Sequence, residues 1–149
     1  MINSNRWQHI LGVARKAKIL ADRLKPNDEP YSEDMFLLGL LHDFGYEFTE
    51  NGKNHAIVAG QILERSGYKY WQDVVNHSEE ATDNMSDETF ILNCADLSVS
   101  PDGKDMSFEE RIVELAKRHG ANSPQYKRAV SKIQKLQKDV RFIKIKDCI

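Results

Sequence analysis

Apolar residues recur along this chain at intervals of three and four, which is the spacing of one buried helix face. In residues 6–24 the apolar positions are Ile10, Val13, Ala14, Ala17, Leu20, Ala21 and Leu24. Near the other end, Ser123 and Pro124 form a helix-start signature, and the pattern continues to about residue 144. Its apolar stripe consists of Tyr126, Val130, Ile133, Leu136, Val140 and Ile143. The pattern predicts amphipathic helices at both ends of the chain.

Start and stop signals divide the middle of the chain into shorter helices. A loop with Pro26 and Pro30 precedes Ser32, which we expect to cap a helix over about 33–42. Further helices are predicted over about 54–66, 69–77, 86–98 and 107–119. No alternating strand pattern, linker or internal repeat is present. The sequence therefore predicts an all-α single domain over residues 1–149, a bundle of about six to seven helices.

Composition narrows the class of protein. A chain of 149 residues with 40% hydrophobic and 30% charged residues can bury about 68–70% of its unfolded surface. Its net charge of −2 gives no general attraction to nucleic acid or acidic membranes. The longest apolar run, residues 35–41, is too short to span a membrane. With no apolar signal-peptide core near its start and two distant cysteines, Cys94 and Cys148, we expect a cytoplasmic protein.

Four of the five histidines combine with two aspartates in a fixed order along the chain. They are His9, the adjacent pair His42 and Asp43, His55, His77 and Asp96. Imidazole nitrogens and carboxylate oxygens are ligands of divalent iron, manganese and zinc. Neighbours in a helix point about 100° apart, but Gly45 predicts a helix end that lets both members of the pair face one site. A lone buried histidine is usually structural; the placement of the whole set favours a metal centre.

The order H…HD…H…H…D resembles that of the HD-domain superfamily of metal-dependent phosphohydrolases. The matching segments are residues 6–9, 40–45, 54–56, 75–77 and 94–97. The resemblance covers about 6–99, and the helices at about 107–146 lie outside it. With both additional histidines, the chain is distantly similar to the two-metal subset that includes bacterial symmetric dinucleoside-tetraphosphate hydrolases.

This resemblance implies that His9, His42, Asp43 and Asp96 hold one ion, and that His55 and His77 hold a second with Asp43 bridging. We therefore expect two divalent ions per chain, iron or manganese first, with zinc, nickel, cobalt or magnesium as alternatives. Two ions about 3.5–4 Å apart stabilise the attacking and leaving oxygens of an in-line displacement. The implied reaction is attack of a metal-bound hydroxide on a phosphate ester or anhydride of a nucleotide or small phosphorylated metabolite.

Supporting residues are expected next to these ligands. Arg6, one turn before His9, is a candidate to pair with substrate phosphate, although it could equally be solvated. Glu47 is a candidate proton donor beside the catalytic Asp43, and a surface position is its alternative. Lys53 is a weaker phosphate-binding candidate. His119, near a helix C-terminus where it favours the helix dipole, is left out of the predicted site.

Three departures from the family pattern bear on the substrate. Tyr46 stands where many members have lysine, residues 78–82 replace a glycine turn rich in Thr and Ser, and residues 97–101 replace a Glu-Pro…Arg segment. Glu79 and Glu80 would repel a highly anionic substrate unless they face away. These departures undercut the dinucleoside-tetraphosphate assignment. They also motivate one alternative, an HD module that senses a nucleotide without turnover; a di-iron oxygenase, from a related helical fold, is another.

The last predicted helix is strongly basic. Its cations are Lys127, Arg128, Lys132, Lys135, Lys138, Arg141, Lys144 and Lys146. We expect a solvated polar face, and with few aromatic residues for base stacking we do not expect nucleic-acid binding. Its apolar stripe is expected to pack on the domain or on a second subunit, so a homodimer through the C-terminal helices stays open.

Overall fold

The computed structural model describes residues 2–149, apart from the side chain of Asn51, and this part of the chain is helical. Its α-helices are α1 (Ser4–Leu24), α2 (Glu29–Leu41), α3 (His55–Arg65), α4 (Trp71–Asn76), α5 (Asp87–Leu97), α6 (Phe108–His119) and α7 (Pro124–Lys138). Short 3-10 segments cover Phe44–Phe48, Glu50–Gly52, Val140–Lys144 and Lys146–Cys148. Within the described residues the only extended pairing is an isolated bridge between Val99 and Asp105. The predicted all-α fold is confirmed.

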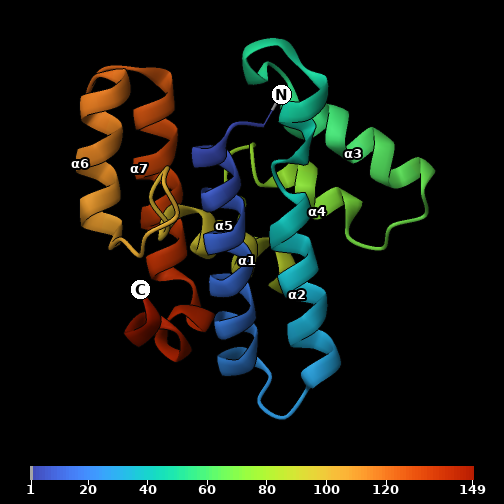
Figure 1. The fold of residues 1–149 in the computed structure, drawn as a ribbon. Coiled ribbons are helices and arrows are strands. Elements are labelled where there is room, and N and C mark those ends of the chain that lie inside the picture. Colours follow the sequence, from blue (N-terminus) through green and yellow to red (C-terminus); the bar gives the residue numbers. More distant parts are fainter. Residues whose placement is uncertain (1) are drawn as a thin grey trace.

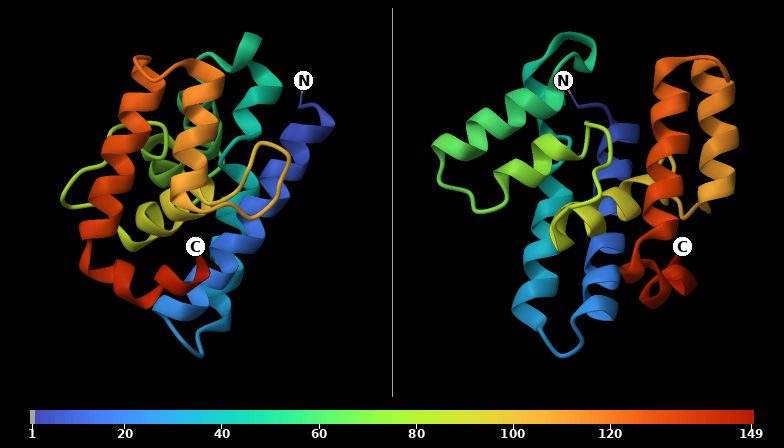
Figure 2. Two further views of the ribbon diagram at one scale, coloured as in Figure 1. Left: turned by 90° about the vertical axis from the view of Figure 1, so that its left-hand side faces the viewer. Right: turned by 180° about the vertical axis from the view of Figure 1, so that it is seen from behind.

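The helices are arranged around α5. Figure 1 shows α1 and α2 as an antiparallel pair, with α6 and α7 on one side of it and α3 and α4 on the other. The views in Figure 2 agree, and α5 contacts α1, α2, α4 and α7. Residues 89–95 of α5 are all buried, as expected for a helix enclosed on every side. This central position brings the C-terminal end of α5 close to several other helix ends.

The contact between α1 and α2, the most extensive in the fold, depends on small residues. On α1 the buried face includes Ala14, Ala17 and Ala21, which allow α2 to approach closely. Gly39 of α2 lies against the backbone of α1: a Cβ there would come within 2.5 Å of the Cα of Ala14. This close packing fixes the N-terminal half of α1 beside the C-terminal end of α2.

The predicted start of α2 was wrong by about one turn. Asp28, not Ser32, caps the helix, and its Oδ1 accepts from the backbone N–H of Tyr31 at 3.1 Å. Pro30 lies inside the first turn, where its missing N–H removes no helical hydrogen bond. Ser32 is buried and its hydroxyl donates to the carbonyl of Glu29.

The predicted end of α7 was also wrong. The helix stops at Lys138 because Asp139 adopts an extended backbone and caps the following 3-10 turn, accepting from the N–H of Arg141. Val140 and Ile143, predicted to continue the buried stripe, are 87% and 70% exposed. The last residues turn back toward α1 (Figure 1), where Lys16 donates to the carbonyl of Cys148 at 2.8 Å.

The predicted starts of the last two helices are confirmed. Ser107 and Glu110 form a capping box at the start of α6, and Ser123 caps α7. Cys94 is a buried core residue. None of the helices in residues 2–149 combines the length and the apolar character needed to cross a lipid bilayer.

The close contact at Gly39 generates a stability prediction. Alanine is favoured over glycine in an exposed helix by about 1 kcal/mol, but here the added methyl meets the α1 backbone. We expect Gly39→Ala to lower the free energy of unfolding by about 2 kcal/mol, a typical cost of overpacking, measured by urea denaturation. The control is Glu33→Ala on the exposed face of the same helix, which should change stability little. A more stable Gly39→Ala protein would contradict the packing argument.

Candidate metal centre

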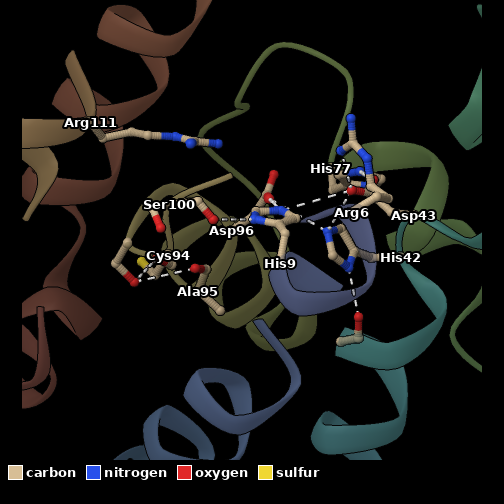
Figure 3. Close-up of polar contacts among 12 residues, drawn as sticks. Arg6, His9, His42, Asp43, His77, Cys94, Ala95, Asp96, Ser100 and Arg111 are labelled. Atoms are coloured by element: carbon tan, nitrogen blue, oxygen red, sulfur yellow. Dashed lines mark hydrogen bonds and ion pairs between the residues drawn. The ribbon is translucent and has the colours of Figure 1, made fainter. Parts of the chain in front are cut away.

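The six predicted ligands come together from five helices, mostly at helix ends. His9 projects from α1, while His42 and Asp43 directly follow the last residue of α2. The remaining ligands are His55, the first residue of α3, His77, just after α4, and Asp96, near the end of α5. Figure 3 shows His9, His42, Asp43, His77 and Asp96 pointing toward one another. Because α2 ends at Leu41, the adjacent His42 and Asp43 both reach the cluster.

Asp43 lies in the middle of the cluster and its two oxygens face different histidines. Oδ2 lies 3.3 Å from Nε2 of His42 and 3.8 Å from Nε2 of His9. Oδ1 lies 3.2 Å from Nε2 of His55 and 3.5 Å from Nε2 of His77. One carboxylate therefore contacts two pairs of imidazoles.

Asp96 completes the cluster on the His9 and His42 side. Its Oδ1 lies 2.9 Å from Nε2 of His9 and 3.4 Å from Nε2 of His42. Within the described residues, two groups of ligand atoms are close enough to share an ion: His9, His42 and Asp96, and His42, Asp43 and His77. His55 belongs to neither group, but its Nε2 contacts Oδ1 of Asp43, which is a member of the second group.

All four histidines are oriented in the same way. Each ring places Nδ1 against a backbone carbonyl, and the pairs are His9 with Ser100 (2.9 Å), His42 with Gly39 (2.6 Å), His55 with Gly52 (3.1 Å) and His77 with Val74. A carbonyl oxygen only accepts, so Nδ1 carries the proton and donates. Each Nε2 then faces Asp43 or Asp96, the orientation in which metal-ligating histidines are usually held.

The electrostatics of the cluster also fit a cation. Burial opposes ionisation of Asp43 and Asp96, but the neighbouring histidines outweigh it and hold both pKa values well below the usual range. Burial lowers the pKa of His42, yet Asp43 and Asp96 overcome this and raise it to about 10. Burial lowers the pKa of His77. His42 Nε2 is buried with no hydrogen-bond partner among the described residues. A buried carboxylate, Asp43, and a partly buried one, Asp96, beside four imidazole Nε2 atoms match the donor set of a divalent ion.

The cluster opens into a cavity of about 750 Å³. Arg6 lies at its edge: Nη1 donates to Oδ2 of Asp43 at 3.0 Å, and the guanidinium lies 3.8 Å from the centre of the Tyr46 ring. The Tyr46 ring in turn stacks on His55 at 4.1 Å. Gly52 packs against Tyr46 so closely that a Cβ would collide with the ring. Tyr46 thus covers His55 and supports Arg6.

The structure places some of the predicted supporting residues in the cavity and others outside it. Arg6 and Lys53 line the cavity. Glu47 does not; it is exposed, lines a separate apolar depression with Trp7 and Phe48, and accepts from the backbone N–H of Ile2 at 2.8 Å. Glu79 and Glu80 are exposed and are not part of the cavity lining. His119, which sequence reasoning left out, does line it.

Four basic residues of the last two helices were missed. Arg111, Arg118 and Arg128 line the cavity. Lys132 of α7 donates from Nζ to the carbonyl of His77 at 2.6 Å, and burial lowers its pKa. For Arg128 and Lys132 the sequence signal is the basic face of the last helix, for which a solvated position is predicted. Part of that face is instead turned toward the site.

Comparison with known proteins extends this picture. The family model described as HD domain matches residues 6–136, so the match continues past the predicted limit of residue 99 through α6 and most of α7. No curated protein and no solved structure matches the chain. Because the family match spans most of the chain and includes all six clustered residues, the chain belongs to the HD-domain superfamily of metal-dependent phosphohydrolases.

Proposed function

We propose that this chain is a phosphohydrolase that cleaves a phosphate ester or anhydride of a nucleotide or small phosphorylated metabolite at two divalent ions. The observation that carries the proposal is the position of Asp43, whose two oxygens face different histidine pairs. A carboxylate in that position is suited to bridging two cations. Membership of the superfamily supports the reaction class.

The proposed ligands are assigned by the oxygen of Asp43 that each one faces. His9, His42 and Asp96 would hold one ion with Oδ2, and His55 and His77 would hold the other with Oδ1. We propose iron or manganese, because nitrogen and oxygen donors are mixed at both positions. Divalent ions held there would supply Lewis acidity toward phosphoryl oxygens and would lower the pKa of water toward neutrality.

The chain's own residues would bind and orient the phosphate. Arg6 already lies at the cavity edge with one N–H on Asp43, and its remaining donors are available for phosphoryl oxygens. The guanidinium packs over the Tyr46 ring, which would help to hold it in place for paired hydrogen bonds to a phosphate. Lys53, also in the lining, would add a positive charge. Glu47 is not part of this proposal, because its carboxylate lies outside the cavity.

Metal content is the first test. We expect about two ions per purified chain by elemental analysis, and phosphate release from a panel of phosphate esters and nucleotides. His55→Ala should lose one ion and more than 100-fold in turnover, because a metal contributes several kcal/mol of transition-state stabilisation. His119→Gln is the matched control: this histidine lines the same cavity but lies outside the cluster, so both ions should remain.

The alternatives give different outcomes in the same assays. Tight nucleotide binding without product, in protein that holds both ions, would identify a sensing module. Oxygen uptake with an organic substrate and no phosphate release would identify an oxygenase. A chain that binds no metal, even after iron or manganese is added, would contradict the proposal.

The role of Arg6 is tested separately. Arg6→Gln should lower kcat/KM by about 10- to 100-fold, the equivalent of one charge-assisted pair worth about 1.5–3 kcal/mol. Arg6→Lys should recover only part of the loss, since lysine cannot pair bidentately. Metal content should be unchanged in both variants. Arg15→Gln, at an exposed arginine of the same helix, should behave like the unmodified protein. Equal activity in Arg6→Gln would mean that Arg6 pairs with Asp43 but does not bind the substrate.

Metal removal should also destabilise the fold, which provides a readout independent of turnover. At a free metal concentration about 100 times Kd, bound metal adds about 2.7 kcal/mol to the free energy of unfolding. For a chain of this size we expect chelation to lower Tm by about 5–10 °C. The shift, measured by circular dichroism, should be smaller in His55→Ala. An unchanged Tm after complete metal removal would argue against a buried metal centre.

A further inference from the structure

The cavity lining is strongly cationic beyond the metal centre. Among its residues the only carboxylates are Asp43 and Asp96, the proposed metal ligands. The lining cations are Arg6, Lys53, Arg111, Arg118 and Arg128. Three of these five come from α6 and α7. Once cations neutralise the two aspartates, the cavity carries a large positive charge that the proposed scissile phosphate alone does not balance.

Arg111 is the most informative of these residues. Figure 3 shows it extending from α6 in the direction of the metal cluster. The residue is only 7% exposed, yet its Nε has no hydrogen-bond partner among the described residues. Within the described residues, the one polar contact of its side chain is a 3.3 Å hydrogen bond from Nη1 to Glu114. A buried guanidinium with an unused N–H is costly unless an acceptor binds to it.

Glu114 holds two of the arginines in place. It accepts from Arg111, and its Oε1 lies 2.7 Å from Nε of Arg118. Glu114 itself is not part of the cavity lining; it supports the arginines from outside. Arg128 of α7 forms no ion pair with the described residues and also lines the cavity. Glu114 therefore neutralises only one of the three positive charges. The arginines keep further N–H groups that can donate to an anion.

We infer that Arg111, Arg118 and Arg128 form a second anion-binding subsite, which binds a phosphate group other than the one that is cleaved. This inference rests on the proposed function and specifies its substrate class: a compound with at least two phosphate groups, such as a polyphosphate chain or a bisphosphorylated metabolite. Glu79 and Glu80 do not oppose it, because they lie outside the cavity lining.

The test compares inorganic phosphate, pyrophosphate and tripolyphosphate by titration calorimetry on the full, metal-containing chain at a fixed free manganese concentration. Elemental analysis of the recovered protein checks that the probes have not removed the metal. We expect affinity to rise with the number of phosphates. Arg111→Gln and Arg128→Gln should each weaken tripolyphosphate binding by about tenfold or more and change phosphate binding less than twofold.

Controls separate the subsite from general charge effects and from misfolding. Lys127→Gln removes an exposed cation of the same helix that does not line the cavity, and it should not change binding. Arg111→Lys should recover part of the affinity for tripolyphosphate that Arg111→Gln loses. Arg128 is exposed, so it can be replaced without disturbing the core. Circular dichroism checks folding of each variant.

Two results would overturn the subsite: wild-type protein with no preference for tripolyphosphate over phosphate, or folded Arg111→Gln and Arg128→Gln variants that bind tripolyphosphate as tightly as wild type. Calorimetry needs no turnover, so these results are distinct from failure of the proposed function, which is the absence of phosphate release from any substrate. If the protein hydrolyses one of these probes, the KM for that probe is compared between wild type and variants in place of Kd.

Discussion

The position of the Asp43 carboxylate is the constraint on which the rest of the site depends. It is 4% exposed and surrounded by four imidazoles and one guanidinium. A buried negative charge is tolerated only where such partners or a metal compensate for it. Those partners come from α1, α3, α4 and the end of α2 itself, so the arrangement of these helices and the ionised state of one side chain are interdependent. The tight packing of α1 on Gly39 and the central position of α5 both serve this convergence.

Backbone carbonyls at helix ends fix the orientation of the histidine rings. His42, His55 and His77 each donate Nδ1–H to the carbonyl of the residue three positions earlier. Near helix C-termini such carbonyls lack helical partners and are available as acceptors. The backbone thereby selects the tautomer of the histidines locally, without a dedicated second side chain. His9, in the second turn of the longer helix α1, instead uses the carbonyl of Ser100 from the loop after α5.

Sequence reasoning could predict the helices and the gathering of His9, His42, Asp43, His55, His77 and Asp96, because helical periodicity and the order of the ligands are both properties of the sequence itself. It missed the start of α2, where Pro30 was interpreted as a loop residue although the first helical turn accepts proline. It missed the end of α7, where an extended Asp139 interrupts an otherwise helical pattern. Arg111, Arg118 and Arg128 could not be identified, because a cation that faces a cavity and one that faces water follow the same periodicity. The outward position of Glu47 depends on its contact with the distant Ile2 N–H, which no local pattern records.

The hydrogen bond from Lys132 to His77 has a mechanical consequence. Helix α4 is only six residues long, too short to be stable alone, so its last turn is held by its neighbours. Lys132 ties that turn to α7, one helical turn beyond Arg128. Because breaking this bond would leave a partly buried ammonium without its acceptor, α7 cannot swing away from α4 freely. Any movement that separates α7 from the end of α4 and widens the cavity therefore has to break this hydrogen bond.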